Sequence, residues 1–247
     1  MRRGQVIRVL GPIDLLTPDG VRSVGSRQAR RLLGVLVVAA GRAVSTDQVR
    51  YALWGEQPPP SADNTLQTYI SRLRRLLGSG AIRRADHSYR LVVGRDQIDA
   101  VQFEDLLIEA GEHRDDPARS AEVCRAALAL WRGEPFGDFV DDEPFHLESI
   151  RLDQLRLAGM ELALESELAL GHHEIVVAEL ESVVQEYPYR ERLWHLLIDA
   201  LLKDERRIEA LQACERLRDT LGEAGLDIGD EVRALEHRIL HEPAGDR

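Results

Sequence analysis

Lysine, cysteine and long apolar runs are scarce in this 247-residue chain. Lysine occurs once, at Lys203, and arginine accounts for the rest of the 32 basic residues. The longest apolar run, Leu32–Ala40, is far shorter than the 18 or more residues that a transmembrane helix needs. Glycine and proline also come too early at the N-terminus for a signal peptide. The sequence therefore predicts no membrane span and a cytoplasmic protein.

The two cysteines, Cys124 and Cys214, lie far apart inside apolar helical patterns. Isolated cysteines in such patterns usually act as small buried hydrophobic residues. We therefore expect neither a disulfide nor a metal site from them.

Recognisable catalytic and cofactor motifs are also missing. The chain has no phosphate-binding G-x-x-x-x-G-K-[ST] run and no G-x-S-x-G nucleophile motif. His237 and His241 are four residues apart, but no cysteine or H-E-x-x-H pattern supports a metal site there, and the pair His172-His173 has no support either. The sequence thus predicts a non-enzyme with no catalytic residue, metal or cofactor.

Acidic residues are scarce in the first part of the chain, although the formal net charge of the whole is −11. Residues 1–98 contain 16 Arg and 7 Asp or Glu, a net charge of +9, whereas residues 99–247 carry −20. This asymmetry predicts two modules with different partners, residues 1–98 and residues 99–247. The basic module is a candidate for polyanion binding.

The basic module has the element pattern of a winged helix-turn-helix. Short β-like runs with Gly-Pro and Pro-Asp-Gly turns come first, followed by three helical patterns and an arginine-rich hairpin. We expect Ser45 with Gln48 to form a capping box, and Ser61 to cap the third helix. The expected elements are strands in 5–11, 13–16 and 21–25, helices in 27–40, 46–55 and 62–77, and a hairpin in 81–93.

The third predicted helix, 62–77, has two distinct faces. At 100° per residue, one narrow stripe collects Leu66, Ile70, Leu73 and Leu77, which we expect to face the core. From Asn64 to Gly78 the helix contains three arginines and no acid. Its other face carries polar and basic side chains, namely Asn64, Thr68, Ser71, Arg72 and Arg75, with Arg74 on the flank. We therefore expect this helix to enter the major groove of double-stranded DNA.

Residues 99–247 are predicted to be almost wholly helical. Shifting the sequence by 34 residues aligns Leu180 with Cys214 and Val183 with Leu217, a spacing typical of tetratricopeptide repeats. We expect a TPR-like helical domain that binds protein. The Gly- and Pro-rich segment 131–145 is expected either to cover one end of the helical stack or to bind a partner. The fold class is thus an α+β winged helix-turn-helix followed by an all-α domain.

Seven segments resemble, in order and spacing, the Streptomyces antibiotic regulatory proteins. The similarity runs from about Val6 to Leu240, and it is carried by "VIRVLGPIDL", "SRQARRLLGVLVVAAG", "ALWGEQPPPSADNTLQTYISRLRRLLG", "ALALWRGEPFGDF", "RLDQLRLAGMELALESELALG", "YRERLWHLLIDALL" and "GEAGLDIGDEVRALEHRIL". The resemblance implies an OmpR-type winged helix joined to a bacterial transcriptional activator domain. It also implies a transcriptional activator of antibiotic (secondary-metabolite) gene clusters, which binds direct repeats beside the −35 region as side-by-side protomers and contacts RNA polymerase, including its sigma factor. The chain resembles the small, stand-alone kind of this family or a piece of a larger member.

The resemblance also implies particular DNA contacts. In the recognition helix they fall on Thr68, Tyr69, Ser71, Arg72 and Arg74. The end of the family's wing matches Tyr89, Arg90 and Leu91, but the glycine expected before that tyrosine is Ser88. Since a left-handed turn is costly for other residues, we expect a longer or differently shaped wing.

Arginine suits these positions because its planar fork binds a guanine edge or a phosphate through two hydrogen bonds. We expect Arg72 to contact a base, Arg75 a base or a phosphate, and Arg74 a phosphate. Further phosphate contacts are expected at the start of the first helix and on the hairpin, from Arg27, Arg30, Arg83, Arg84, Tyr89 and Arg90.

Two further expectations concern the modules. Residues 1–98 alone should bind DNA but activate poorly, because the acidic remainder should contact polymerase. The alternative that stays open is a helical adaptor, or a repressor, built from the same modules. The operator, the controlled genes and any effector ligand are not encoded in recognisable form.

Overall fold

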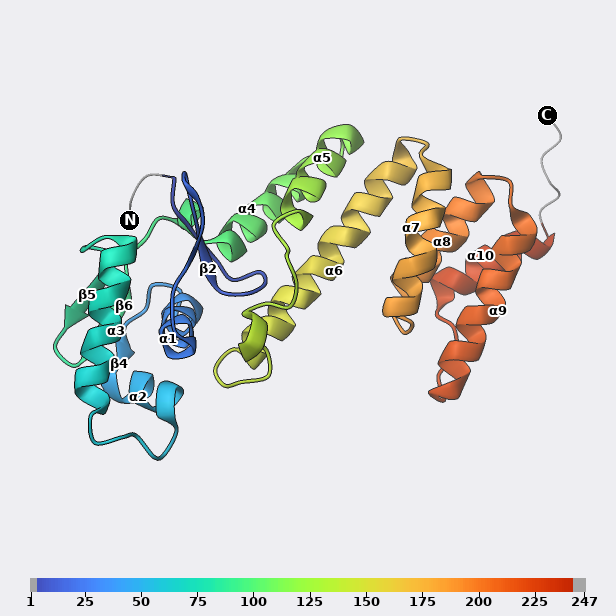
Figure 1. The fold of residues 1–247 in the computed structure, drawn as a ribbon. Helices are drawn as coiled ribbons and strands as arrows, with labels where there is room; N and C mark the ends of the chain where they lie inside the picture. Colours follow the sequence, from blue (N-terminus) through green and yellow to red (C-terminus); the bar gives the residue numbers. More distant parts are fainter. Residues whose placement is uncertain (1–3, 242–247) are drawn as a thin grey trace. The chain divides into compact units, whose positions relative to one another are not determined.

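The N-terminal part of the chain forms two small antiparallel sheets and three helices (Figure 1). The computed structural model describes residues 4–241. The first sheet has the order β1-β2-β3 and the second the order β4-β6-β5. The elements here are β1 (Val6–Arg8), β2 (Asp14–Thr17), β3 (Gly20–Ser23), α1 (Arg27–Val38), β4 (Val44–Ser45), α2 (Thr46–Trp54), α3 (Ala62–Leu77), β5 (Ile82–Ala85) and β6 (Ser88–Leu91).

The rest of the described chain is helical. A short 3-10 turn, η1 (Arg95–Gln97), leads into α4, and a second, η2 (Gly137–Phe139), lies in the segment before α6. The α-helices are α4 (Asp99–Glu112), α5 (Pro117–Leu128), α6 (His146–Ala169), α7 (His173–Glu186), α8 (Glu191–Lys203), α9 (Arg207–Glu223) and α10 (Asp230–His241). The predicted fold class, a winged helix followed by an all-helical domain, is confirmed.

The chain divides into two compact units. The first unit contains residues up to 108 together with 126–158, and the second contains 109–125 and 159 onward. The compact units therefore do not follow a single cut in the sequence. The functional boundary expected between residues 98 and 99 stays a prediction.

The first unit is built around α1. Leu32, Leu33 and Leu36 are fully buried in one core with the inner side chains of β1 and β2 and the apolar stripe of α3. The same core includes residues beyond position 98, namely Phe103, Ala127, Phe136, Phe139, Phe145 and Leu152. A single core therefore joins the predicted DNA-binding module to a segment more than 30 residues further along the chain.

The aromatic segment 131–145 belongs to this core. The Phe145 ring lies 5.1 Å from Phe136 and 5.5 Å from Phe139, centre to centre. It also packs so close to Gly34 of α1 that a methyl group placed on this glycine would lie 2.6 Å from Phe145 Cε1. The expectation that this segment covers one end of the helical stack is wrong, because its rings fill the first unit beside α1.

The second unit is a stack of helical hairpins. Helix α7 packs on α8, α8 on α9, and α10 on both α8 and α9. Helices α7 and α9 begin at His173 and Arg207, 34 residues apart, which agrees with the predicted repeat. Both cysteines are buried, as expected, and burial raises the pKa of each thiol to about 11. Among residues 4–241, no helix combines the length and apolar composition that crossing a bilayer demands.

Candidate nucleic-acid interface

Helix α3 presents one buried and one exposed face, as its sequence period predicts. Leu66, Ile70, Leu73 and Leu77 are at most 1% exposed. The opposite side is exposed at Asn64, Thr68, Ser71, Arg72 and Arg75. Because the apolar stripe is anchored in the core, the polar face has a fixed direction.

Helix α3 lies beside the β5–β6 hairpin (Figure 1), and two of its side chains are hydrogen-bonded to that hairpin. Arg74 Nε donates to the carbonyl of Ile82 at 2.9 Å, and Gln67 Nε2 donates to the hydroxyl of Tyr89 at 2.7 Å. These bonds hold the hairpin in a defined position beside the recognition helix. The expected phosphate contact of Arg74 stays a prediction for its remaining N–H groups.

Tyr89 is a structural residue of the hairpin. Its side chain is fully buried, and its hydroxyl is already bonded to Gln67. This position is inconsistent with the DNA contact expected at Tyr89, because no part of the ring reaches the surface. Tyr69 is half-buried and packs against the same core, so only part of its side chain is accessible.

The turn of the hairpin is short. Ala85 pairs with Ser88, which leaves Asp86 and His87 as its two turn residues. Asp86 takes the positive φ of 47°, a conformation that aspartate tolerates better than most residues. The left-handed residue of the turn is therefore Asp86, and Ser88 lies in β6, so Ser88 does not bear the strain expected of it; a longer or differently shaped wing stays a prediction. The arginines of this hairpin are exposed, namely Arg83, Arg84 and Arg90.

The N-terminal ends of α2 and α3 differ in how they are capped. At α2, Ser45 and Gln48 form the expected capping box, with both reciprocal hydrogen bonds in place. At α3, Ser61 occupies the N-cap position, as expected, but its side chain makes no capping hydrogen bond. The first turn of α3 instead carries Asp63, an acid that suits a helix N-terminus and lies 3.4 Å from Arg50.

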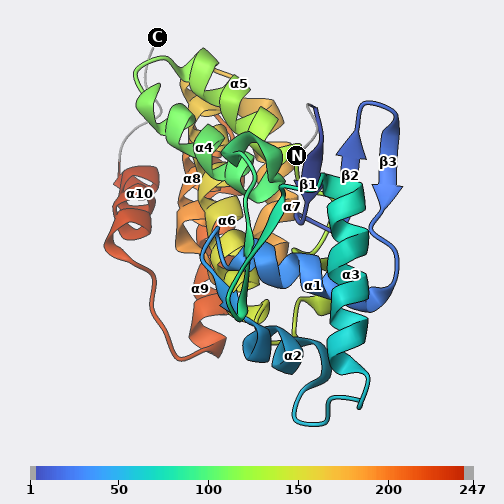
Figure 2. The same cartoon turned by 90° about the vertical axis from the view of Figure 1, so that its left-hand side faces the viewer.

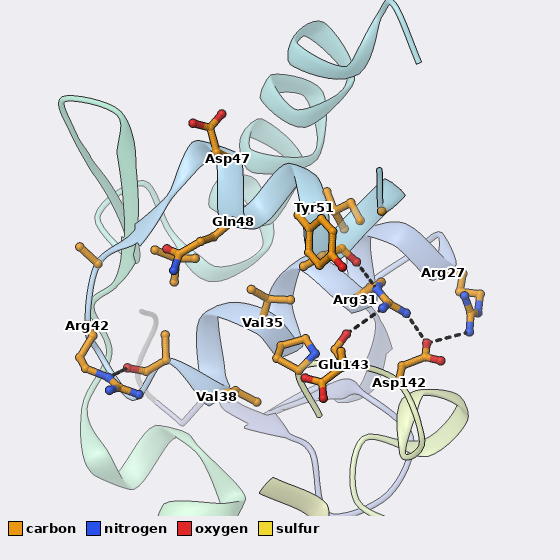
Figure 3. A pocket seen from close by; sticks show the side chains of 17 residues that line it. Arg27, Arg31, Val35, Val38, Arg42, Asp47, Gln48, Tyr51, Asp142 and Glu143 are labelled. Atoms are coloured by element: carbon orange, nitrogen blue, oxygen red, sulfur yellow. Dashed lines mark hydrogen bonds and ion pairs between the residues drawn. The ribbon is translucent and has the colours of Figure 1, made fainter. Parts of the chain in front are cut away.

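The arginines at the start of α1 have partners within the first unit. Arg27 lies 3.5 Å from the carboxylate of Asp142, and Arg30 lies 3.5 Å from that of Asp138. Arg31 donates to Asp142 and to the carbonyls of Ala52 and Glu143, and so connects α1, α2 and the aromatic segment (Figure 3). DNA phosphates would have to compete with these acids, so the contacts expected of Arg27 and Arg30 stay predictions.

A hollow of about 1130 Å³ lies beside these arginines, between α1, α2 and residues 142–144 (Figure 3). Its lining is mixed, with Val35 and Tyr51 among the apolar residues and Arg42 and Asp47 among the charged ones. The sequence pattern does not indicate this hollow, because the residues that close it are separated by about 90 positions in the chain.

The arginines fall into two groups by their hydrogen bonds. Within the described range 4–241, no hydrogen bond or ion pair engages the guanidinium of Arg72, Arg75, Arg83 or Arg90. The guanidinium of Arg84 lies over the Tyr89 ring, 5.9 Å from the ring centre. The exposed faces of α3 and the hairpin thus present guanidinium groups whose donors are free for phosphates and base edges.

Within residues 4–241, no group of three or more histidine, cysteine or acidic side chains could hold a metal ion. One strongly shifted group lies elsewhere in the first unit: burial raises the pKa of Asp99 to about 6, against the opposing effect of hydrogen bonds and Arg132. Asp99 is not among the residues that the sequence pattern indicates.

A winged helix with a free basic face, attached to an all-helical domain, defines a DNA-binding transcriptional regulator. Residues 23–87 match the family described as transcriptional regulatory protein, C terminal. Residues 98–240 match the bacterial transcriptional activator domain. The chain belongs to the Streptomyces antibiotic regulatory protein family, in which these two parts occur together, and nothing in these families indicates a catalytic domain.

Curated relatives show the same similarity along most of the chain. Regulatory protein DnrI of Streptomyces peucetius is 34% identical, and the match covers 98% of this chain and 94% of DnrI. Regulatory protein AfsR of Streptomyces griseus is also 34% identical over 94% of this chain, which spans only 24% of AfsR.

A solved structure supports the fold as well. It is described as Mycobacterium tuberculosis EmbR in complex with a low affinity phosphopeptide. The two structures superpose with a TM-score of 0.91 at 30% identity, and the match covers 99% of this chain and 67% of the EmbR chain.

Proposed function

We propose that this regulator binds direct repeats beside the −35 region as side-by-side protomers and activates transcription by contacting RNA polymerase, including its sigma factor. Its targets would be secondary-metabolite genes, as membership of the Streptomyces antibiotic regulatory protein family favours. A cytoplasmic location fits this role. The observation that carries the proposal is the anchored α3 helix, whose exposed face has no acid from Asn64 onward. That face carries Arg72 and Arg75, whose guanidinium groups make no hydrogen bond or ion pair within residues 4–241.

Footprinting on the promoters next to the gene, followed by run-off transcription, tests this function. We expect protection of two or more direct repeats next to −35 and an increase in transcript. Protection that overlaps the polymerase site with a loss of transcript would make the protein a repressor. An absence of protection at any salt concentration would favour the helical adaptor.

Replacing Arg72 by alanine is expected to cost about 1–3 kcal/mol of operator binding and to relax the preference at one base position. Arg72 is exposed and no hydrogen bond or ion pair within residues 4–241 engages its guanidinium, so it can form a bidentate contact with a guanine edge. The measurement is fluorescence anisotropy with the operator and with single-base variants of it.

Arg22→Ala provides the control, since Arg22 is an exposed arginine on β3 and so lies outside the recognition helix. We expect it to bind the operator like the parent. If Arg72→Ala kept the parental affinity and base preference while Arg22→Ala lost them, α3 would not be the recognition helix.

Replacing Arg83 on the hairpin should weaken binding to all sequences equally. A phosphate contact contributes about 0.9 to the slope of log affinity against log salt, so the slope should fall by about 1 in Arg83→Ala. A salt titration with operator and with unrelated DNA measures both effects. An unchanged slope, or a loss restricted to the operator, would contradict a phosphate role for Arg83.

A further inference from the structure

The corner between β3 and α1 lies directly against the recognition helix. Figure 2 shows the chain running from β3 past α3 into the start of α1. At this corner stands Gly25, whose φ is +111°. A methyl group placed on Gly25 would come within 2.5 Å of both Cζ and Nη2 of Arg72. The guanidinium of Arg72 therefore occupies the space that a side chain at position 25 would fill.

The backbone of Gly25 is held in place from several sides. Its N–H donates to Ser23 Oγ at 3.1 Å, and its carbonyl accepts from Arg30 Nη1 at 3.3 Å. The preceding residue, Val24, is fully buried in the core. Gly25 thus presents Arg72 with a fixed backbone surface and not with a mobile side chain.

The contact leaves Arg72 free to bind. No hydrogen bond or ion pair to its guanidinium occurs in the described part of the chain, so the Gly25 backbone restricts the side chain without using its donors. An unrestrained arginine loses about 2 kcal/mol of rotamer entropy when it is immobilised. A side chain that already rests on a fixed surface loses less when it meets a base.

We propose that Gly25 is a positioning residue for DNA recognition: its bare Cα lets the guanidinium of Arg72 lie against the β3–α1 corner and orients it toward one base of the operator. The proposal rests on the base contact proposed above for Arg72. It adds that the specificity of the recognition helix depends on a residue outside that helix, which itself contacts no DNA.

Gly25→Ala in the full chain tests this, with Gly20→Ala as its matched control. Gly20 has nearly the same φ, +109° against +111°, but nothing lies within 4 Å of a methyl group placed on it. Both variants should therefore suffer a similar backbone strain and a similar fall in melting temperature. Only Gly25→Ala should displace Arg72, and this displacement costs little stability because a guanidinium is the flexible end of a long side chain.

The readout is discrimination, the ratio of the affinities for the footprinted operator and for a scrambled duplex of equal length at one salt concentration. We expect Gly25→Ala to lower it about tenfold, which corresponds to most of the rotamer entropy of one arginine. Gly20→Ala should leave it unchanged. In an Arg72→Ala background, Gly25→Ala should have no further effect, because the side chain it orients is gone.

The outcomes separate the two proposals. If the parent protein bound the operator no better than the scrambled duplex, the proposed function would be wrong. If Arg72→Ala discriminated as well as the parent, the proposed base contact of Arg72 would be wrong, and with it the positioning role of Gly25. If Gly25→Ala and Gly20→Ala showed the same discrimination, the positioning role alone would be overturned. The same would follow if Gly25→Ala lowered discrimination equally in the parent and in the Arg72→Ala background. Should Gly25→Ala fail to fold, Ser23→Ala loosens the same corner without strain, and an unchanged discrimination there would also overturn the proposal.

Discussion

Replacing Phe145 by alanine is expected to lower the unfolding free energy of the first unit by about 3–5 kcal/mol, the usual cost of removing a buried phenylalanine. The ring is fully buried and touches Phe136, Phe139 and Gly34 of α1. Because the neighbouring rings and the helix are themselves packed, the cavity should collapse only in part. Urea denaturation of the full chain, followed by circular dichroism and by operator binding, measures the loss.

Leu147→Ala is the matched control for this experiment. Leu147 lies two residues further along but is 71% exposed, so its truncation should change stability by no more than about 0.5 kcal/mol. Equal stability of Phe145→Ala and the parent would show that the aromatic segment does not complete the core of this unit.

The same packing changes what we expect of a shortened chain. The sequence predicts that residues 1–98 alone bind DNA. Such a fragment lacks Phe103, Phe136, Phe139 and Phe145, and would expose to water the surfaces of α1 and β2 that they cover. We now expect the fragment to be poorly folded, whereas a piece that includes residues up to 158 retains the whole core cluster.

Local patterns in the sequence predicted the recognition helix well. The bounds of α3 and its buried stripe follow from a period of 3.6 residues, which depends only on neighbours along the chain. The capping box of α2 is equally local, and it is present. Both predictions succeed because every residue they need lies within a few turns of one helix.

Features that depend on distant residues were not predictable in this way. The burial of Tyr89 follows from the position of α3 and from its bond to Gln67, 22 residues away in the chain. The partners of Arg27, Arg30 and Arg31 lie more than 100 residues away, at Asp138 and Asp142. Composition shows that these residues are charged, but not that they are paired. The contact between Gly25 and Arg72 was not predictable for the same reason, because it joins residues from different parts of the chain.

Replacing Asp99 by alanine is expected to cost the first unit about 3–5 kcal/mol, as is usual when one partner of a buried charged network is removed. The carboxylate is 1% exposed, accepts from the backbone N–H groups of Val9, Leu10 and Ala100, and lies 3.6 Å from Arg132. It thereby fastens the chain after β1 to the start of α4. Without it, two buried N–H groups after β1 lose their partner.

Asp105→Ala on the same helix is the control. Asp105 makes an exposed ion pair with Arg95, and exposed pairs contribute at most about 1 kcal/mol. Calorimetry at pH 7.5 on both variants and the parent compares the two acids. If Asp99→Ala melted at the parental temperature, the carboxylate would not join β1 to α4.

Asp99 should also make stability depend on pH. Burial raises its pKa to about 6, above the value near 3.8 that an exposed aspartate has. Between these two pKa values, Asp99 holds a proton in the folded chain that it has lost in the unfolded chain, and this proton uptake favours folding. The full stabilisation is therefore present below about pH 4. The stabilisation declines as pH rises through 6, by about 3 kcal/mol in all, because the folded and unfolded pKa values lie about two apart. Unfolding free energies of the parent and of Asp99→Asn from pH 4 to pH 7 measure this. The decline should be absent in Asp99→Asn, and equal slopes in the two proteins would assign the titration to another group.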